Sequence, residues 1–84
     1  MNPTRQRVIE MIENRFFHDR PFDLDDEDSF LEEGVIDSLG MIELVSMIEA
    51  NFGVKVADEE LSPDNLDSVR ALTEYLVRKG DGTR

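Results

Sequence analysis

The sequence contains no cysteine and no tryptophan, and it has a single histidine, His18. Without cysteine the chain can form neither a disulfide framework nor a cysteine-based zinc site. We expect His18 near the end of the first helix, as a surface residue and not as half of a catalytic pair. No apolar run approaches the roughly 18 residues of a membrane span. The residue types therefore predict no catalytic and no metal-ligating residues.

Basic residues are also scarce, because nine Lys and Arg stand against 20 Asp and Glu, for a formal net charge of −11. Residues 21–69 hold 15 acidic residues and one basic residue, Lys55. This negative field repels nucleic acid and anionic membranes, and it attracts partners with a basic patch. No apolar stretch follows the basic start of the chain, so we predict no signal peptide and a cytoplasmic protein.

The 84 residues predict one domain, 1–84, with a small core, and we expect a monomer. Hydrophobic residues make up 39% of the chain, which is enough for a folded helical domain. Little room remains for a deep substrate cavity with a catalytic shell around it.

Two stretches predict long helices in the first part of the chain. Asn2 as N-cap and Pro3 at the first helical position begin a helix that runs to about residue 16. The clearest helix covers residues 38–52 and is followed by Gly53 as its C′ residue. Its predicted core face is widened by Met41 and Leu44 and consists of Ile42, Val45, Ile48 and Phe52.

The last part of the chain predicts a short helical turn at 58–61, a turn or loop at 62–65, and a final helix. Asp67 or Ser68 caps this final helix, and Gly80 ends it before a frayed tail at 81–84. Its predicted apolar face consists of Val69, Leu72, Tyr75 and Leu76.

Residues 18–36 form a long acidic connection, which we expect to fold onto the core through Leu24, Phe30, Leu31 and Ile36. Gly34 is predicted at a turn. The sum is an all-α fold, a small four-helix bundle with three longer helices, one short helix and a long first loop.

Asp37-Ser38-Leu39 lies where this loop leads into the predicted helix 38–52. Ser and Asp are common helix caps, so a structural role for the pair is one interpretation. A capping box starting at Ser38 would place Glu or Gln at position 41, where the chain has Met41.

The tripeptide resembles the Asp-Ser-Leu signature of acyl carrier proteins and their peptidyl and aminoacyl relatives. The flanking runs resemble the same family over roughly residues 5–79: 32–36 its loop before the serine, 42–45 and 49–53 its second helix, 56–60 its short third helix, and 67–69 the start of its last helix.

The resemblance implies that Ser38 is the attachment point of 4′-phosphopantetheine, with Asp37 and Leu39 beside it. A phosphopantetheinyl transferase would install the arm from coenzyme A, and the terminal thiol would carry cargo as a thioester. The implied partners are this transferase, an acyl- or aminoacyl-loading enzyme, and downstream synthase enzymes with basic patches. The implied recognition residues are Leu39, Met41, Glu43, Glu49, Asp58, Glu59 and Glu60.

The family implies a non-enzymatic carrier for fatty-acid, polyketide or related biosynthesis, and an aminoacyl or peptidyl carrier, including the D-alanyl type, is the alternative. Gly40, Ser46 and Ala57 depart from the pattern of fatty-acid carriers and leave the cargo open. A lipid-like cargo would be sheltered by an interior whose predicted lining is Val8, Ile12, Ile42, Val45, Ile48, Leu72 and Leu76.

A hydrolase is excluded, because residues 34–40 do not form a G-x-S-x-G elbow and His18 is the only histidine. Asp23, Asp25 and Glu27 have the spacing of a calcium loop, but Asp28 and Gly34 stand where that loop needs a glycine and a bidentate carboxylate. An acidic helical interaction domain without a prosthetic arm is the stronger alternative to a carrier.

Overall fold

The computed structural model describes residues 3–17, 19 and 21–80, and within them every regular element is a helix. The order is α1 (Pro3–Phe16), α2 (Ser38–Phe52), a 3₁₀ turn η1 (Asp58–Glu60), α3 (Pro63–Leu66) and α4 (Val69–Arg78). This confirms the all-α prediction and the three longer helices. The predicted N-cap Asn2, His18 and the tail 81–84 lie outside the described residues.

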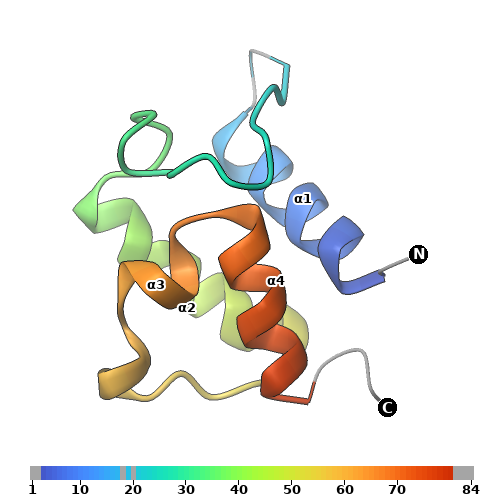
Figure 1. The fold of residues 1–84 in the computed structure, drawn as a ribbon, viewed down its shortest axis with the longest axis vertical. Helices are drawn as coiled ribbons and strands as arrows, with labels where there is room; N and C mark the ends of the chain where they lie inside the picture. The colour runs from blue at the N-terminus through green and yellow to red at the C-terminus, as the bar shows by residue number, and fades with distance from the viewer. Residues whose placement is uncertain (1–2, 18, 20, 81–84) are drawn as a thin grey trace.

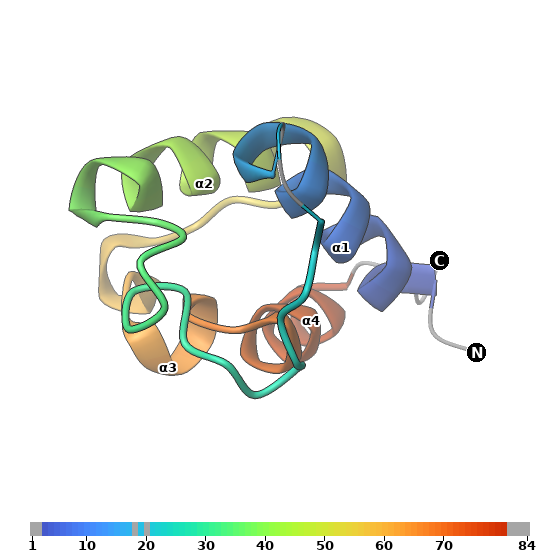
Figure 2. The same cartoon turned by 90° about the horizontal axis from the view of Figure 1, so that it is seen from above.

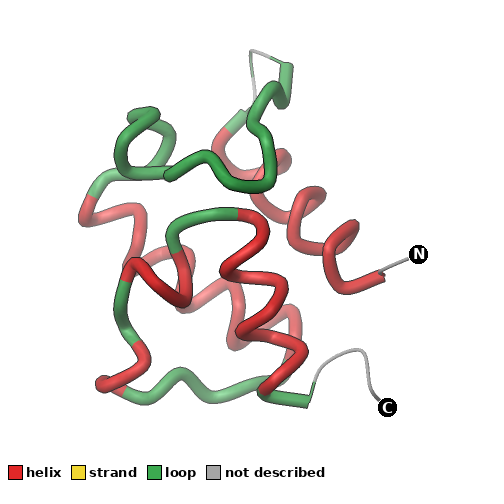
Figure 3. The backbone as a smooth tube through the Cα atoms, viewed as in Figure 1, coloured by secondary structure: helices red, strands yellow, loops and turns green. Residues whose placement is uncertain are grey.

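The helices enclose one core, with α1 and α2 on one side of it and α3 and α4 on the other (Figures 1 and 2). α4 packs against both α1 and α3. The long connection before α2 crosses one end of the bundle, and the segment from α2 to η1 crosses the other end (Figure 3). Both connections therefore approach α4 from opposite ends.

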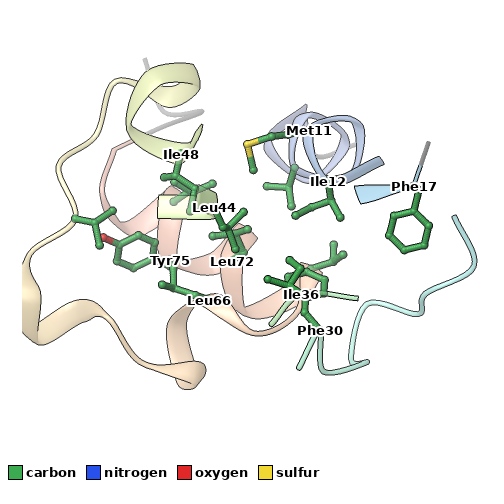
Figure 4. Close-up of a cluster of buried hydrophobic side chains, with 14 residues drawn as sticks. Met11, Ile12, Phe17, Phe30, Ile36, Leu44, Ile48, Leu66, Leu72 and Tyr75 are labelled. Carbon is green, nitrogen blue, oxygen red and sulfur yellow. The ribbon is translucent and has the colours of Figure 1, made fainter. Parts of the chain in front are cut away.

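Fourteen hydrophobic side chains form the buried cluster, and every helix except η1 contributes to it (Figure 4). Their burial is the main favourable term for a domain of this size. They are Val8, Met11, Ile12, Phe17, Phe30, Ile36, Leu44, Ile48, Val56, Leu66, Val69, Leu72, Tyr75 and Leu76.

The boundaries of α2 follow from its caps. Gly53 ends the helix in the left-handed conformation, with φ of 69°, and its N–H donates to the carbonyl of Glu49. Both features are typical of a glycine that terminates a helix, as predicted. The side it buries differs from the prediction, because Leu44 and Ile48 are fully buried while Ile42 is 66% exposed. Its innermost stripe also includes Gly40 and has a spacing of four residues.

Residues 62–65 were predicted as a turn or loop, and this is wrong. Pro63 begins the short helix α3, and Ser62 precedes it in an extended conformation. Proline favours the first position of a helix, where its missing N–H costs no hydrogen bond. α3 brings Leu66 into the core, where it is 3% exposed.

α4 begins after Ser68, whose hydroxyl accepts a hydrogen bond from the N–H of Ala71 at 3.0 Å. Its predicted apolar face is confirmed, because Val69, Leu72, Tyr75 and Leu76 are all buried. Asp67, the other predicted cap, contacts the long connection instead.

Candidate functional site

Asp37 caps the start of α2. Its backbone is extended, and its carboxylate Oδ1 accepts a hydrogen bond from the N–H of Gly40 at 2.7 Å. The carbonyl of Asp37 accepts from the N–H of Met41 at 2.9 Å. Of the two residues considered as caps, Asp37 therefore satisfies the helix end, and Ser38 is the first residue of the helix.

Ser38 is exposed, and its hydroxyl makes no hydrogen bond to any residue that the structure describes. The N–H groups of Ser38 and Leu39 likewise have no acceptor among the described residues. Donors of this kind at a helix start favour an anion, so a phosphodiester on Ser38 fits the local chemistry. The hydroxyl is also open to approach by another enzyme.

Gly40 allows a close approach between α2 and the preceding loop. A Cβ atom at this position would lie 2.8 Å from Cγ2 of Ile36 and 3.3 Å from Oδ1 of Asp37. Ile36 is 2% exposed and has little freedom to move away. A larger side chain than glycine at position 40 would therefore collide with Ile36.

The loop before Ser38 is held from within and from the α3–α4 junction. Inside the loop, the carbonyl of Phe30 accepts from the N–H groups of Val35 and Ile36 at 3.0 and 3.3 Å. From the junction, the carboxylate of Asp67 accepts from the hydroxyl of Ser29 and from the N–H of Leu31.

Of the predicted anchors of this loop, Phe30 and Ile36 are buried, and Leu24 is partly buried against the core. The prediction for Leu31 is wrong, because its side chain is 40% exposed. Gly34 has φ of 73° and makes the predicted turn.

The two apolar recognition residues differ in exposure. Leu39 is 72% exposed beside Ser38, whereas Met41 is half-buried against the core. The structure thus presents Leu39 to a partner fully and Met41 in part.

The acidic recognition residues fall into two groups. Asp58 and Glu59 are exposed, and their carboxylates contact no polar group among the described residues. Glu43 pairs with Arg15, and Glu49 accepts a hydrogen bond from the N–H of Val56 at 3.0 Å.

Glu60 holds η1 against α4. Its Oε1 accepts from the N–H of Ala57, from the hydroxyl of Tyr75 and from Nζ of Lys79, at 2.9, 2.9 and 3.1 Å. The hydrogen bond from Ala57, followed by those from Lys79 and Tyr75, lowers the pKa of Glu60 below its ordinary value. Burial, reinforced by Glu60, raises the pKa of Tyr75 to about 12.

An apolar cavity of about 320 Å³ lies between α2 and the segment containing η1 and α3. Five residues of the predicted cargo interior do not line it, because Val8, Ile12, Ile48, Leu72 and Leu76 are packed without exposure in the core. Val45 does line the cavity, and so does the exposed Ile42. The complete lining is Leu31, Met41, Ile42, Val45, Ser46, Leu61, Ser62, Pro63 and Leu66.

Arg15 and Leu61 were not predicted to act at the site, and Ile42 was predicted only as part of the cargo interior. Arg15 comes from α1 and bonds Glu43 across 28 positions of sequence. Ile42 and Leu61 are exposed apolar side chains at the cavity, 66% and 49% exposed. No local pattern marks Arg15, whereas the high apolar content of α2 was a signal that some of its apolar residues lie outside the core.

Among residues 3–17, 19 and 21–80, no group of three or more His, Asp or Glu side chains is placed to hold a metal ion. In the same ranges no helix has the length and apolar character needed to cross a membrane.

Comparison with known proteins shows the family of the chain. Residues 6–76 match the family described as "Phosphopantetheine attachment site". The chain is 36% identical over 73 residues to the D-alanyl carrier protein of Streptococcus sanguinis, covering 87% of this chain and 90% of that one. It is 34% identical over 73 residues to the D-alanyl carrier protein of Streptococcus thermophilus, with the same coverage. It is 35% identical over 69 residues to that of Streptococcus pyogenes, covering 82% and 85%.

The chain belongs to the phosphopantetheine-binding carrier protein family, whose prosthetic group is 4′-phosphopantetheine. Within that family it is related to D-alanyl carrier proteins. It is thus a carrier that enzymes modify and load, and not itself a catalyst.

Proposed function

We propose that Ser38 is the attachment point of 4′-phosphopantetheine and that the loaded chain carries an aminoacyl group of the D-alanyl type. The observation that carries the proposal is the exposed Ser38 hydroxyl, which bonds to none of the described residues, while Asp37 caps the helix. The similarity to D-alanyl carrier proteins over most of both chains supports this cargo.

Each residue at the start of α2 has a separate part in this function. Ser38 Oγ forms the new bond to phosphorus and loses its proton, while the pyrophosphate bond of coenzyme A breaks. Asp37 keeps the first turn of α2 ordered before and after the transfer, and Leu39 offers apolar contact to the enzyme beside it. When bound, the arm supplies a thiol that holds the cargo as a thioester.

The attachment is tested by incubating the purified chain with coenzyme A, Mg²⁺ and a phosphopantetheinyl transferase of broad specificity. We expect the intact mass to rise by one phosphopantetheine in the wild type and not in Ser38→Ala. Ser46→Ala is the matched control, because Ser46 is an exposed serine on the same helix, and it should be modified normally. An unmodified wild type beside an active transferase would favour an interaction domain without an arm.

A second candidate cargo is a fatty-acyl or polyketide chain, and the apolar cavity of about 320 Å³ favours it. An apolar chain released from water into this cavity would gain roughly 0.8 kcal/mol for each buried methylene. A D-alanyl group has one methyl and gains little there. The two cargoes therefore differ in how strongly the cavity would retain them.

The cargo is tested by offering the holo chain to a D-alanine-activating ligase with ATP and, separately, to acyl-loading enzymes. We expect D-alanylation to be the faster reaction at equal enzyme concentration. Preferential acylation would support the second candidate. In that case the side-chain NMR signals of Ile42 and Leu61 should shift with acyl-chain length, because both line the cavity. The proposal also includes the partner enzymes and the cytoplasmic location that the sequence predicts.

A further inference from the structure

Arg15, near the end of α1, pairs with Glu43, which is the first acidic residue of α2 after Ser38. Its Nη2 is 2.8 Å from Oε2 of Glu43, and the two side chains are 46% and 48% exposed. The guanidinium also lies over the ring of Phe16, 5.6 Å from its centroid. The cation of α1 is therefore held on the same surface as the predicted recognition acid.

The ion pair lies beside the attachment position. Arg15 and Glu43 line a cavity of about 360 Å³, which is also lined by three neighbours of Ser38 in sequence, Asp37, Leu39 and Gly40. The lining of this cavity carries one positive and two negative side chains, so an anionic ligand would gain nothing there. The pair instead decides what charge the first turns of α2 present to a docking enzyme.

A paired charge and a free charge attract a basic partner differently. Opposite charges 2.8 Å apart largely cancel at the distances over which a partner is steered, whereas an isolated carboxylate acts over about 10 Å at 0.1 M salt. Asp58 and Glu59, on η1, have free carboxylates. Glu43, which is nearer to Ser38 in the sequence, is instead neutralised by Arg15.

We propose that Arg15 is a specificity-determining residue of this carrier, because it withdraws Glu43 from recognition and so reduces the negative charge that α2 presents beside Ser38. A basic partner is then directed to Asp58 and Glu59, and enzymes that depend on an acidic α2 are disfavoured. The inference rests on the proposed function, in which such enzymes must approach Ser38. An exposed pair of this kind adds little to stability, so removing Arg15 should leave the fold intact.

The test uses the full apo chain as substrate of a phosphopantetheinyl transferase whose docking face is basic. The variant Arg15→Gln frees Glu43, and we expect KM for the carrier to fall by about two- to fivefold at low salt, with kcat unchanged. The gain should vanish at about 0.5 M salt because exposed charges are then screened. Arg15→Lys keeps the cation and should behave as the wild type.

The double variant Arg15→Gln/Glu43→Gln decides whether the pair acts as a neutral unit. We expect its KM to return to the wild-type value, since one neutral arrangement replaces another. A KM several-fold above the wild type would mean that Glu43 contacts the enzyme in spite of Arg15, and this would overturn the inference. An unchanged or higher KM for Arg15→Gln would overturn it as well.

Arg70→Gln is the matched control for net charge. Arg70 is an exposed arginine that pairs with Glu27 and Glu74, and none of the three lines either cavity beside Ser38. Its loss changes the total charge equally and should leave KM within about twofold of the wild type. An equal fall in KM for Arg70→Gln would mean that the effect of Arg15→Gln comes from total charge alone, and it would overturn the inference. Failure of the wild type to be modified at all would instead count against the proposed function.

Discussion

The segments before and after α2 are held in place by different physics. The leading segment, residues 21–37, inserts two fully buried side chains, Phe30 and Ile36, and binds Asp67 through Ser29 and Leu31. The trailing segment, residues 53–62, inserts only Val56 and depends on the hydrogen bonds that Glu60 accepts. One side of the site is thus fixed mainly by hydrophobic burial, and the other by a carboxylate.

The leading and trailing segments should therefore respond differently to pH. Apolar burial is insensitive to pH, so the contribution of Phe30 and Ile36 to the leading segment should persist over a wide range. The trailing segment should respond to pH, because the groups that hold it titrate. Substitutions in the two segments should therefore have effects of different size and kind.

Phe30→Ala should have the largest effect, because Phe30 has no exposed surface and anchors the leading segment. Loss of a buried phenylalanine costs about 3–5 kcal/mol, which is a large part of the stability of a small domain. Urea denaturation followed by circular dichroism measures the change. Leu31→Ala is the matched control, since Leu31 is 40% exposed and its loss should cost about 1 kcal/mol or less. Equal effects at the two positions would contradict the burial of Phe30.

Asp67→Ala should destabilise the protein by about 1–3 kcal/mol, because the N–H of Leu31 and the hydroxyl of Ser29 lose their acceptor. The loss should be concentrated in the leading segment, which hydrogen exchange at Leu31 can measure. Asp64→Ala removes an exposed carboxylate from α3 and serves as the control. If both variants exchange alike at Leu31, Asp67 does not hold the segment.

Glu60→Gln should act on the trailing segment and can be followed through Tyr75, the only tyrosine of the chain. We expect the pKa of Tyr75 in an absorbance titration to fall from about 12 toward its ordinary value of 10.0, in part only, because burial remains. Glu59→Gln, which removes an exposed neighbour, should leave the titration unchanged. A Tyr75 pKa that is the same in all three proteins would count against the hydrogen bond to Glu60.

The same groups set the direction of the pH dependence of stability. The folded pKa of Glu60 is lowered, so its contribution is present above its ordinary pKa of 4.5 and is lost as the pH falls through the lower folded value. The folded pKa of Tyr75 is raised, so its contribution is present below pH 10.0 and is lost as the pH rises through about 12. Thermal unfolding at several pH values should show both losses in the wild type, and the acid loss should be smaller in Glu60→Gln.

Thr73→Val should have the smallest effect and the opposite sign. Thr73 is buried in α4, and its hydroxyl is a buried side-chain polar atom without a partner among the described residues. Replacing it by a methyl group should stabilise the helix against which both segments rest by about 1 kcal/mol. Thr73→Ser keeps the hydroxyl and should not raise the midpoint of urea unfolding. A destabilised Thr73→Val would indicate that the hydroxyl has a partner, such as a bound water.

The sequence was most informative where local chemistry decides the structure. Pro3, Gly53 and the apolar periodicity were enough to predict the bounds of α1 and α2, because caps and breakers act on their own neighbours. The residues around Ser38 predicted the family for a similar reason, since the signature is contiguous.

The sequence failed where the choice depends on packing between distant segments. α2 has apolar residues on most of its circumference, so its pattern could not decide that Leu44 faces the core and Ile42 faces solvent. Gly40 lies on the buried side with Leu44, and a Cβ atom there would lie 2.8 Å from Cγ2 of Ile36. Asp67 was predicted as a helix cap, and Glu43 as a recognition residue. The sequence could not reveal their partners, Ser29 and Arg15, because these are remote in sequence.

The division of labour between Asp37 and Ser38 separates the folding of this carrier from its loading. Because Asp37 and not the Ser38 hydroxyl caps α2, esterification of Ser38, as proposed, removes no hydrogen bond that the fold uses. Modified chains should then be at least as stable and at least as resistant to proteolysis as unmodified ones. Modification would accordingly not expose the carrier to degradation.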